Sequence, residues 1–180
     1  IRVTKSNKYI STIDDNPLVE NDMIRIRRKI IPIDAKTTYF FGHPQIMASY
    51  NGILQNVPSE NYSIYDSTLL DDKIYCTSDS YGVISFNIRT KKIARVELNS
   101  VPEKEFFYVI EKGEDNSLFL GGTNKIVVYN PKTKNTSITP LNDLTVYAIT
   151  QEGSLFWIGT NKGLRCAKYK NGRFNWITVP

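Results

Sequence analysis

Short runs of alternating apolar and polar residues, separated by turn-forming residues, dominate this chain. The clearest group fills its C-terminal part, with runs at 146–150, 155–159, 164–169 and 174–179. A period of two indicates strands rather than helices. Asn171-Gly172, between the last two runs, readily adopts the positive φ values of a tight hairpin. These residues predict an antiparallel sheet of four strands.

The same order of runs and turns recurs along the chain. Small or polar residues end the second run of each repeat, at Gly42, Thr77, Gly121 and Gly159, and an aromatic residue follows each of them at Tyr50, Phe86, Tyr129 and Tyr169. The repeat length, roughly 40 residues, is typical of a propeller blade. We predict an all-β fold of four β-propeller blades, each a sheet of three or four antiparallel strands. Their expected limits are 23–57, 62–98, 105–141 and 143–180.

The remaining segment, 1–22, fits no repeat and is interpreted as the end of a preceding blade or a linker. Because an open array leaves sheet edges and blade faces uncovered, we expect the chain to belong to a larger propeller, most simply a seven-bladed one. We also expect the isolated chain to associate with a second copy or to close as a small ring.

Large apolar residues in the second run of each repeat are predicted to pack between blades: Phe40, Tyr75, Phe119 and Trp157. For Trp157 the alternative is stacking on a ligand. Gly121 and Gly159 are expected to allow close approach of neighbouring sheets.

Composition fits a globular β-protein, with 41% hydrophobic, 12% aromatic and 23% charged residues. The sequence has no apolar run of about 18 residues and no signal-peptide pattern. It begins at Ile1, so we interpret it as a processed or excised piece whose targeting segment lies outside it.

The net charge is +5, and basic residues gather at Arg25, Arg27, Arg28 and Lys29. Residues 23–27 alternate as an edge strand with one wet face does, and basic side chains on an edge discourage pairing with other chains. Attraction of anions or acidic polysaccharides is the second interpretation, and nucleic-acid binding is the third.

Catalytic and metal chemistry find little support. His43 is the single histidine, and no Ser, His and carboxylate set or Cys–His pair accompanies it, so we predict a protein without enzymatic activity or cofactor. Cys76 and Cys166 fall in non-adjacent repeats and are expected to be free, buried thiols. Asp14-Asp15-Asn16 and Asp71-Asp72 lack the spacing of a calcium loop and are interpreted as solvated turns.

The segment Gly-Ser-Leu-Phe-Trp-Ile-Gly-Thr-Asn-Lys-Gly-Leu at 153–164 resembles the two-component regulator propeller repeat. Residues 118–123 match it in part, with Leu120 where Ile is usual, and Ile126 lies one place beyond the expected Gly. The resemblance extends over 23–180 at the level of blades. It implies the extracytoplasmic, periplasmic sensor region of a membrane-anchored hybrid histidine kinase that detects breakdown products of polysaccharides.

In propeller geometry, the turns joining the second and third strands of all blades lie on one face. They carry amide, charged and aromatic groups suited to an oligosaccharide or another small polar ligand, at His43, Gln45, Asp79, Tyr81, Asn124, Lys125, Asn161 and Lys162. The alternative is that these residues form solvated turns.

Two functions are consistent with this sequence. The first is ligand sensing, with an oligosaccharide, the remaining blades or a second copy as partners, no nucleic acid, and membrane contact only through segments outside the chain. The second is a protein-interaction scaffold of the WD-repeat type, which ranks lower because no Gly-His or Trp-Asp pair occurs at equivalent blade positions.

Overall fold

The computed structural model describes residues 2–3, 9–10, 26–43, 46–57 and 62–178. All regular secondary structure in these residues is β-strand. The strands are β1 (Arg2–Val3), β2 (Tyr9–Ile10), β3 (Ile26–Pro32), β4 (Thr37–His43), β5 (Met47–Tyr50), β6 (Ile53–Asn56), β7 (Ile64–Leu70), β8 (Lys73–Ser78), β9 (Gly82–Asn87), β10 (Ile93–Arg95), β11 (Phe107–Lys112), β12 (Leu118–Tyr129), β13 (Thr136–Glu152), β14 (Leu155–Thr160), β15 (Gly163–Lys170) and β16 (Arg173–Ile177). No helix able to cross a membrane occurs among the described residues.

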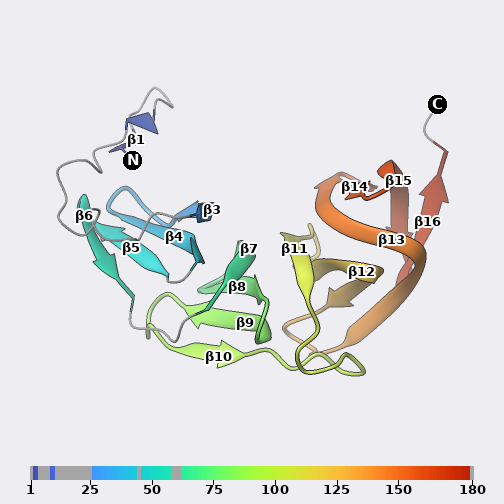
Figure 1. Ribbon diagram of the computed structural model, residues 1–180, viewed down its shortest axis with the longest axis horizontal. Helices are drawn as coiled ribbons and strands as arrows, with labels where there is room; N and C mark the ends of the chain where they lie inside the picture. Colours follow the sequence, from blue (N-terminus) through green and yellow to red (C-terminus); the bar gives the residue numbers. More distant parts are fainter. Residues whose placement is uncertain (1, 4–8, 11–25, 44–45, 58–61, 179–180) are drawn as a thin grey trace.

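Consecutive strands pair antiparallel, and the sheets follow one another along an arc (Figure 1). The first sheet contains β3 to β6, the second β7 to β10, and the last β11 to β16, while β1 pairs only with β2. The strands β3, β7 and β11 stand on the concave side of the arc (Figure 1). The predicted all-β fold of blade-like antiparallel sheets is confirmed.

The third and fourth repeats share one hydrogen-bonded sheet because two of its strands are long and change partner. In β12, Leu118–Gly122 pairs with β11, whereas Lys125–Tyr129 pairs with the start of β13. The change falls at Asn124, whose φ is 58°. The later half of β13 pairs with β14. The predicted blade limits, including the assignment of 1–22, fall partly outside the described residues and stay a prediction.

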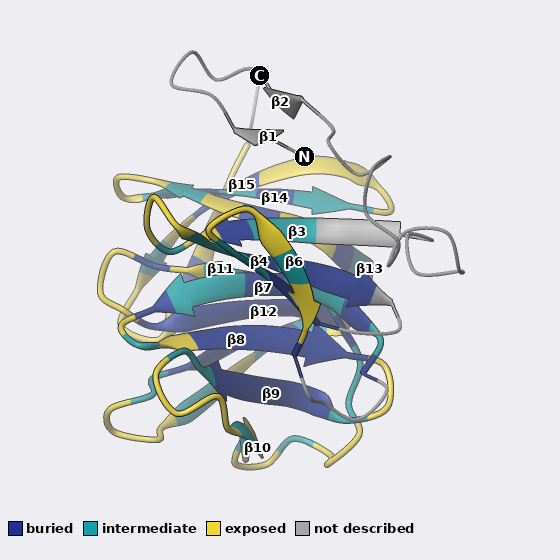
Figure 2. Ribbon diagram, turned by 90° about the vertical axis from the view of Figure 1, so that its left-hand side faces the viewer, coloured by how far each residue is buried: buried dark blue, intermediate teal, exposed yellow. Residues whose placement is uncertain are grey.

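Side chains from facing sheets form three apolar clusters. Tyr39, Phe41, Ile74 and Phe86 belong to the cluster between the first and second sheets. Figure 2 shows that buried residues follow the central strands, whereas exposed residues gather in the turns. The second cluster joins β8 and β9 to β11 and β12, and the third joins β12 to β14, β15 and β16. Burial between successive sheets therefore holds the arc together.

A β-bulge at the same place in four strands aligns the repeats. The register shifts between Arg27 and Lys29 in β3, and equivalent shifts occur in β7, β11 and β13. The residues that pair just after the bulges are Phe41, Thr77, Gly121 and Gly159. The first repeat is therefore anchored at Phe41, and its predicted anchor, Gly42, was wrong by one residue.

This alignment makes Tyr39, Tyr75, Phe119 and Trp157 equivalent. The first three are buried, each in the cluster shared with the following sheet. Trp157 is half-exposed: its neighbours Phe156 and Ile158 face the preceding repeat, so Trp157 points to the opposite side, where no described sheet follows. The prediction of packing between blades is thus confirmed for Tyr75 and Phe119.

The same prediction was wrong for Trp157 and Phe40. Phe40 is half-exposed, since Tyr39 and Phe41 occupy the side of β4 that faces the second sheet. In both strands, the burial alternates with the pleat and places the predicted residue on the side away from the neighbouring sheet.

Gly121 permits a close approach between the third and fourth repeats. A Cβ atom there would lie 2.5 Å from Cγ1 of Val146 in the fourth repeat and 2.6 Å from Cγ1 of Val109, its own cross-strand partner. A Cβ atom at the equivalent Gly159 would contact only its cross-strand partner, with Cβ of Ala148 at 3.2 Å. Gly159 and Trp157 therefore lie on a sheet face that no other described sheet covers.

Candidate functional site

The predicted ligand residues of the second and fourth repeats lie in the turns after the second strand, whereas the turn predicted at Asn124 and Lys125 was wrong, because the chain continues there as one strand that changes partner. Asp79 and Tyr81 lie between β8 and β9, Asn124 and Lys125 lie within β12, and Asn161 and Lys162 lie between β14 and β15. His43 ends β4, but its side chain and the whole of Gln45 lie outside the described residues.

Three of these side chains hold neighbouring segments. Lys125 Nζ lies 2.9 Å from Oε2 of Glu105, and both residues are half-buried. Asn161 Oδ1 accepts a hydrogen bond from the backbone N–H of Thr145 at 2.9 Å. The rings of Tyr81 and Tyr62 pack edge to face, with centroids 4.8 Å apart. Asp79, Asn124 and Lys162 are exposed.

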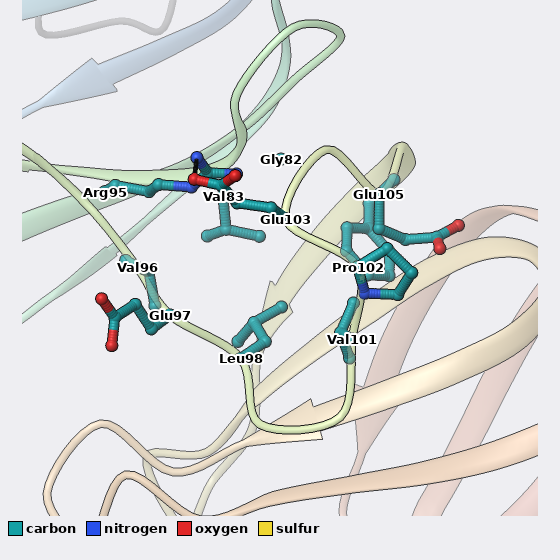
Figure 3. A pocket seen from close by; sticks show the side chains of 11 residues that line it. Gly82, Val83, Arg95, Val96, Glu97, Leu98, Val101, Pro102, Glu103 and Glu105 are labelled. Atoms are coloured by element: carbon teal, nitrogen blue, oxygen red, sulfur yellow. Dashed lines mark hydrogen bonds and ion pairs between the residues drawn. The ribbon is translucent and has the colours of Figure 1, made fainter.

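One cavity, of about 310 Å³, lies between the second sheet and the connection that follows β10 (Figure 3). Val83, Leu98 and Val101 line its apolar side. At its rim Arg95 Nη1 pairs with Glu103, while Arg95 Nη2 is buried and has no hydrogen-bond partner among the described residues. None of the predicted ligand residues lines this cavity.

A second cavity, of about 390 Å³, opens at the turns before β12 and β14. Its polar rim includes Glu114 and Gln151, whose Oε1 accepts the backbone N–H of Glu114 at 3.0 Å. Phe119, Phe156 and Tyr169 form its aromatic wall. It too contains none of the predicted ligand residues.

On the concave side of the arc, Asp66 connects three strands. Its Oδ1 lies 3.2 Å from Nζ of Lys29 in β3, and its Oδ2 accepts the backbone N–H of Ile110 in β11 at 3.1 Å. Nearby, burial raises the pKa of Glu111; Lys29 opposes this shift and Asp66 adds to it. The ionic groups here fix the sheets to one another.

Four aromatic rings form a continuous row beside this network, which we call the aromatic ladder: Tyr65, Phe106, Tyr108 and Tyr147. The centroids of Tyr65 and Phe106 are 4.6 Å apart, those of Phe106 and Tyr108 are 4.5 Å apart, and those of Tyr108 and Tyr147 are 5.0 Å apart. All three pairs meet edge to face, the arrangement that aromatic quadrupoles favour.

The three tyrosines of the ladder occupy the bulges of β7, β11 and β13. Because Tyr108 is the extra residue, Phe107 faces the preceding sheet while Val109 faces the following one. Tyr108 is thereby displaced from the ordinary pleat. Both β7 and β11 are edge strands of their sheets, and this edge lies on the concave side of the arc (Figure 1).

Sequence reasoning missed the ladder, although a signal for it exists. In three of the four bulged strands, an apolar residue is followed by tyrosine at the bulge, as in Ile64-Tyr65, Phe107-Tyr108 and Val146-Tyr147. A bulge cannot be distinguished from regular alternation in a single sequence, so the exceptional direction of these side chains was not apparent.

The thiols are free and buried, as predicted. Burial raises the pKa of the Cys76 thiol well above its ordinary value, and the charge of Asp66 adds to the shift. A thiol of this kind is a poor nucleophile. In the described part of the chain, no three His, Cys, Asp or Glu residues lie close enough together to hold a metal ion.

Comparison with protein families and with curated protein sequences gives no match. Solved structures do match. An extracellular domain from B. thetaiotaomicron, described in one structure as part of a one-component system and in another as part of a hybrid two-component system, has a TM-score of 0.71 at 17% and 16% identity. The match covers 83% of this chain and 22% of that domain.

Two further structures from the same organism are similar. The extracellular domain of another hybrid two-component system has a TM-score of 0.63 at 13% identity, with 83% of this chain and 23% of that domain covered. An auxiliary nutrient binding protein has a TM-score of 0.67 at 12% identity, with coverages of 83% and 40%. The chain thus shares the fold of a part of each of these proteins and spans less than half of the length of each.

Proposed function

We propose that this chain is part of the ligand-sensing propeller of an extracytoplasmic, membrane-anchored two-component sensor, and that its ligands derive from polysaccharides. The observation that supports this most strongly is the fold shared with extracellular domains of such systems, at a TM-score of 0.71. The low sequence identity leaves the ligand to be inferred from the side chains of this chain. The proposed location is the periplasm.

The proposed binding surface combines the turn face with the concave side of the arc. Its turns offer Asp79, Asn124 and Lys162 as exposed polar groups. Tyr81, Lys125 and Asn161 are proposed to shape the surface through their contacts with neighbouring segments. Binding rather than catalysis is proposed, because the thiols are buried and the carboxylate of Asp66 is engaged in joining strands.

The outward face of the last sheet supports a larger array. Trp157 shares this face with Leu164 and Ile177, which are 61% and 38% exposed. On each preceding sheet the equivalent face is covered by the next sheet. We therefore propose that a further blade, from the same protein or a second copy, packs here. Signal would pass as a change in the packing of such rigid arrays.

A binding assay that also follows the chemical fate of the ligand tests this proposal. The chain is titrated calorimetrically with neutral tetrasaccharides, and each mixture is then analysed by chromatography. We expect saturable binding with every sugar recovered unchanged. Conversion of a sugar would indicate an enzyme, and absence of binding to all sugars would overturn the proposed ligand class.

A further inference from the structure

We propose that the aromatic ladder is a stacking platform for the ring faces of a neutral oligosaccharide. The inference rests on the proposed sensing function and adds the place and the mode of binding. None of its residues was among those expected from the turns. Two of the rings come from β7 and β11, which stand on the concave side of the arc (Figure 1).

Exposure distinguishes the ladder from the aromatic residues of the core. Phe119 is 1% exposed and lies within a cluster of rings between sheets. Tyr147 is 52% exposed, and Tyr65, Phe106 and Tyr108 are half-buried. One side of the ladder is therefore exposed to solvent. Packing between sheets alone does not explain why aromatic residues occupy these solvent-exposed positions.

The bulges provide a second, independent observation. A bulge leaves one residue unpaired and turns its side chain out of the pleat, and bulges are frequent beside functional sites. Here the residue at the register shift is tyrosine in three successive inner strands, at Tyr65, Tyr108 and Tyr147. Phe106, from the connection before β11, fills the interval between Tyr65 and Tyr108. The row is thus continuous across the strands.

Ring geometry indicates the shape of the ligand. Because neighbouring rings meet edge to face, successive rings turn different sides toward a common surface. Tyrosine offers a rigid, amphipathic contact with little loss of side-chain entropy. A chain of linked pyranose rings has apolar C–H faces and hydroxyl-rich edges, so it can stack on the tyrosine rings and hydrogen-bond to their hydroxyls.

The charges beside the ladder favour a neutral ligand. Glu105, next to Phe106 in the chain, is paired with Lys125, and Asp66, next to Tyr65, is paired with Lys29. These two acidic groups are thus compensated by basic ones. A charged sugar would have to compete with these pairs, whereas a neutral sugar would not.

Substitutions at Tyr147 test the proposal, because this exposed residue can be changed with little effect on folding. The probes are cellotetraose, xylotetraose, mannotetraose and maltotetraose, with tetragalacturonic acid as a charged comparison. Affinity is measured by calorimetry for the 180-residue chain and its variants Tyr147→Leu and Tyr147→Phe. The matched control is Trp176→Leu, since Trp176 is a 44% exposed aromatic residue of β16 outside the ladder.

We expect at least one neutral tetrasaccharide to bind, and Tyr147→Leu to weaken it by about tenfold, the effect of removing one stacked ring. Tyr147→Phe keeps the ring and should stay within about threefold, as should Trp176→Leu. Unchanged affinity in Tyr147→Leu would overturn the ladder while leaving the sensing function intact. Preference for the charged sugar would overturn the neutral ligand, and failure of all sugars to bind would overturn both proposals.

Discussion

Trp157 occupies in β14 the position that Phe119 occupies in β12, two residues before the glycine that pairs just after the bulge. Phe119 packs against Phe156 of the following repeat, with ring centroids 4.5 Å apart. Trp157 is half-exposed, and its Nε1 donates a hydrogen bond to Oε2 of Glu152 at 3.4 Å. The same position of the repeat is therefore buried where another described repeat follows and half-exposed where none does.

This difference predicts unequal effects of truncation. Phe119→Ala should lower the free energy of unfolding by about 3–5 kcal/mol, because it opens a cavity between sheets. Trp157→Ala should lower it by about 1 kcal/mol or less, as is usual for exposed positions. Urea unfolding followed by circular dichroism measures both. Equal losses would show that the Trp157 face is already covered in the isolated chain.

The carboxylate of Asp66 should stabilise the arc. Asp66→Ala removes the contacts to Lys29 and to the backbone of Ile110, so we expect a loss of about 1.5–3 kcal/mol, typical of hydrogen bonds to charged groups. Asp72→Ala is the control, because its side-chain contacts are long, with Arg89 at 3.9 Å and a hydrogen bond from Nδ2 of Asn87 at 3.4 Å, and should contribute about 0.5 kcal/mol. Similar losses in both variants would refute the connecting role of Asp66.

Glu111 should make stability depend on pH. Its pKa is raised above 4.5 in the folded protein by burial, so its contribution to stability is complete below about pH 4.5 and is lost as the pH rises through the raised value. Glu111→Gln removes this loss. The variant should therefore gain stability relative to the original chain at pH 7 and lose this advantage at pH 4. An advantage that is equal at both pH values would contradict the assignment.

The two thiols should differ in accessibility. Both thiols are buried, but Cys76 is 0% exposed within the first cluster, whereas Cys166 is 4% exposed and pairs with Trp157 on the outward face of the last sheet, which no other described sheet covers. Alkylation by iodoacetamide, followed by mass spectrometry of peptides, should modify Cys166 first and Cys76 only on unfolding. Faster modification of Cys76 would be inconsistent with this packing.

Much of the fold was predictable from local pattern. Alternation and turn residues identify strands such as β14 and β15 because hairpins are specified by residues close in sequence. The division of β12 and β13 between partners was not predictable, since it depends on contacts between Thr123 and Thr145 of different repeats. The first repeat was misaligned because the bulge in β3 and the aromatic pair Phe40-Phe41 allow two registers.

The candidate site was predictable only in part. The turn residues follow from the repeat itself, and the structure places Asn161 in the turn after β14, whereas Asn124 lies within β12 at the point where that strand changes partner. The ladder depends on a backbone irregularity that brings Tyr65, Tyr108 and Tyr147 together from three strands. No single repeat contains enough of the ladder to suggest a row of rings.

A crystal structure of the chain with a bound neutral tetrasaccharide would show where the sugar lies. We expect sugar rings on the concave side of the arc, stacked on Tyr147 and Tyr108, with the sheets otherwise unchanged. Sugar bound instead in the cavity beside Arg95, or on the outer strands, would contradict this expectation.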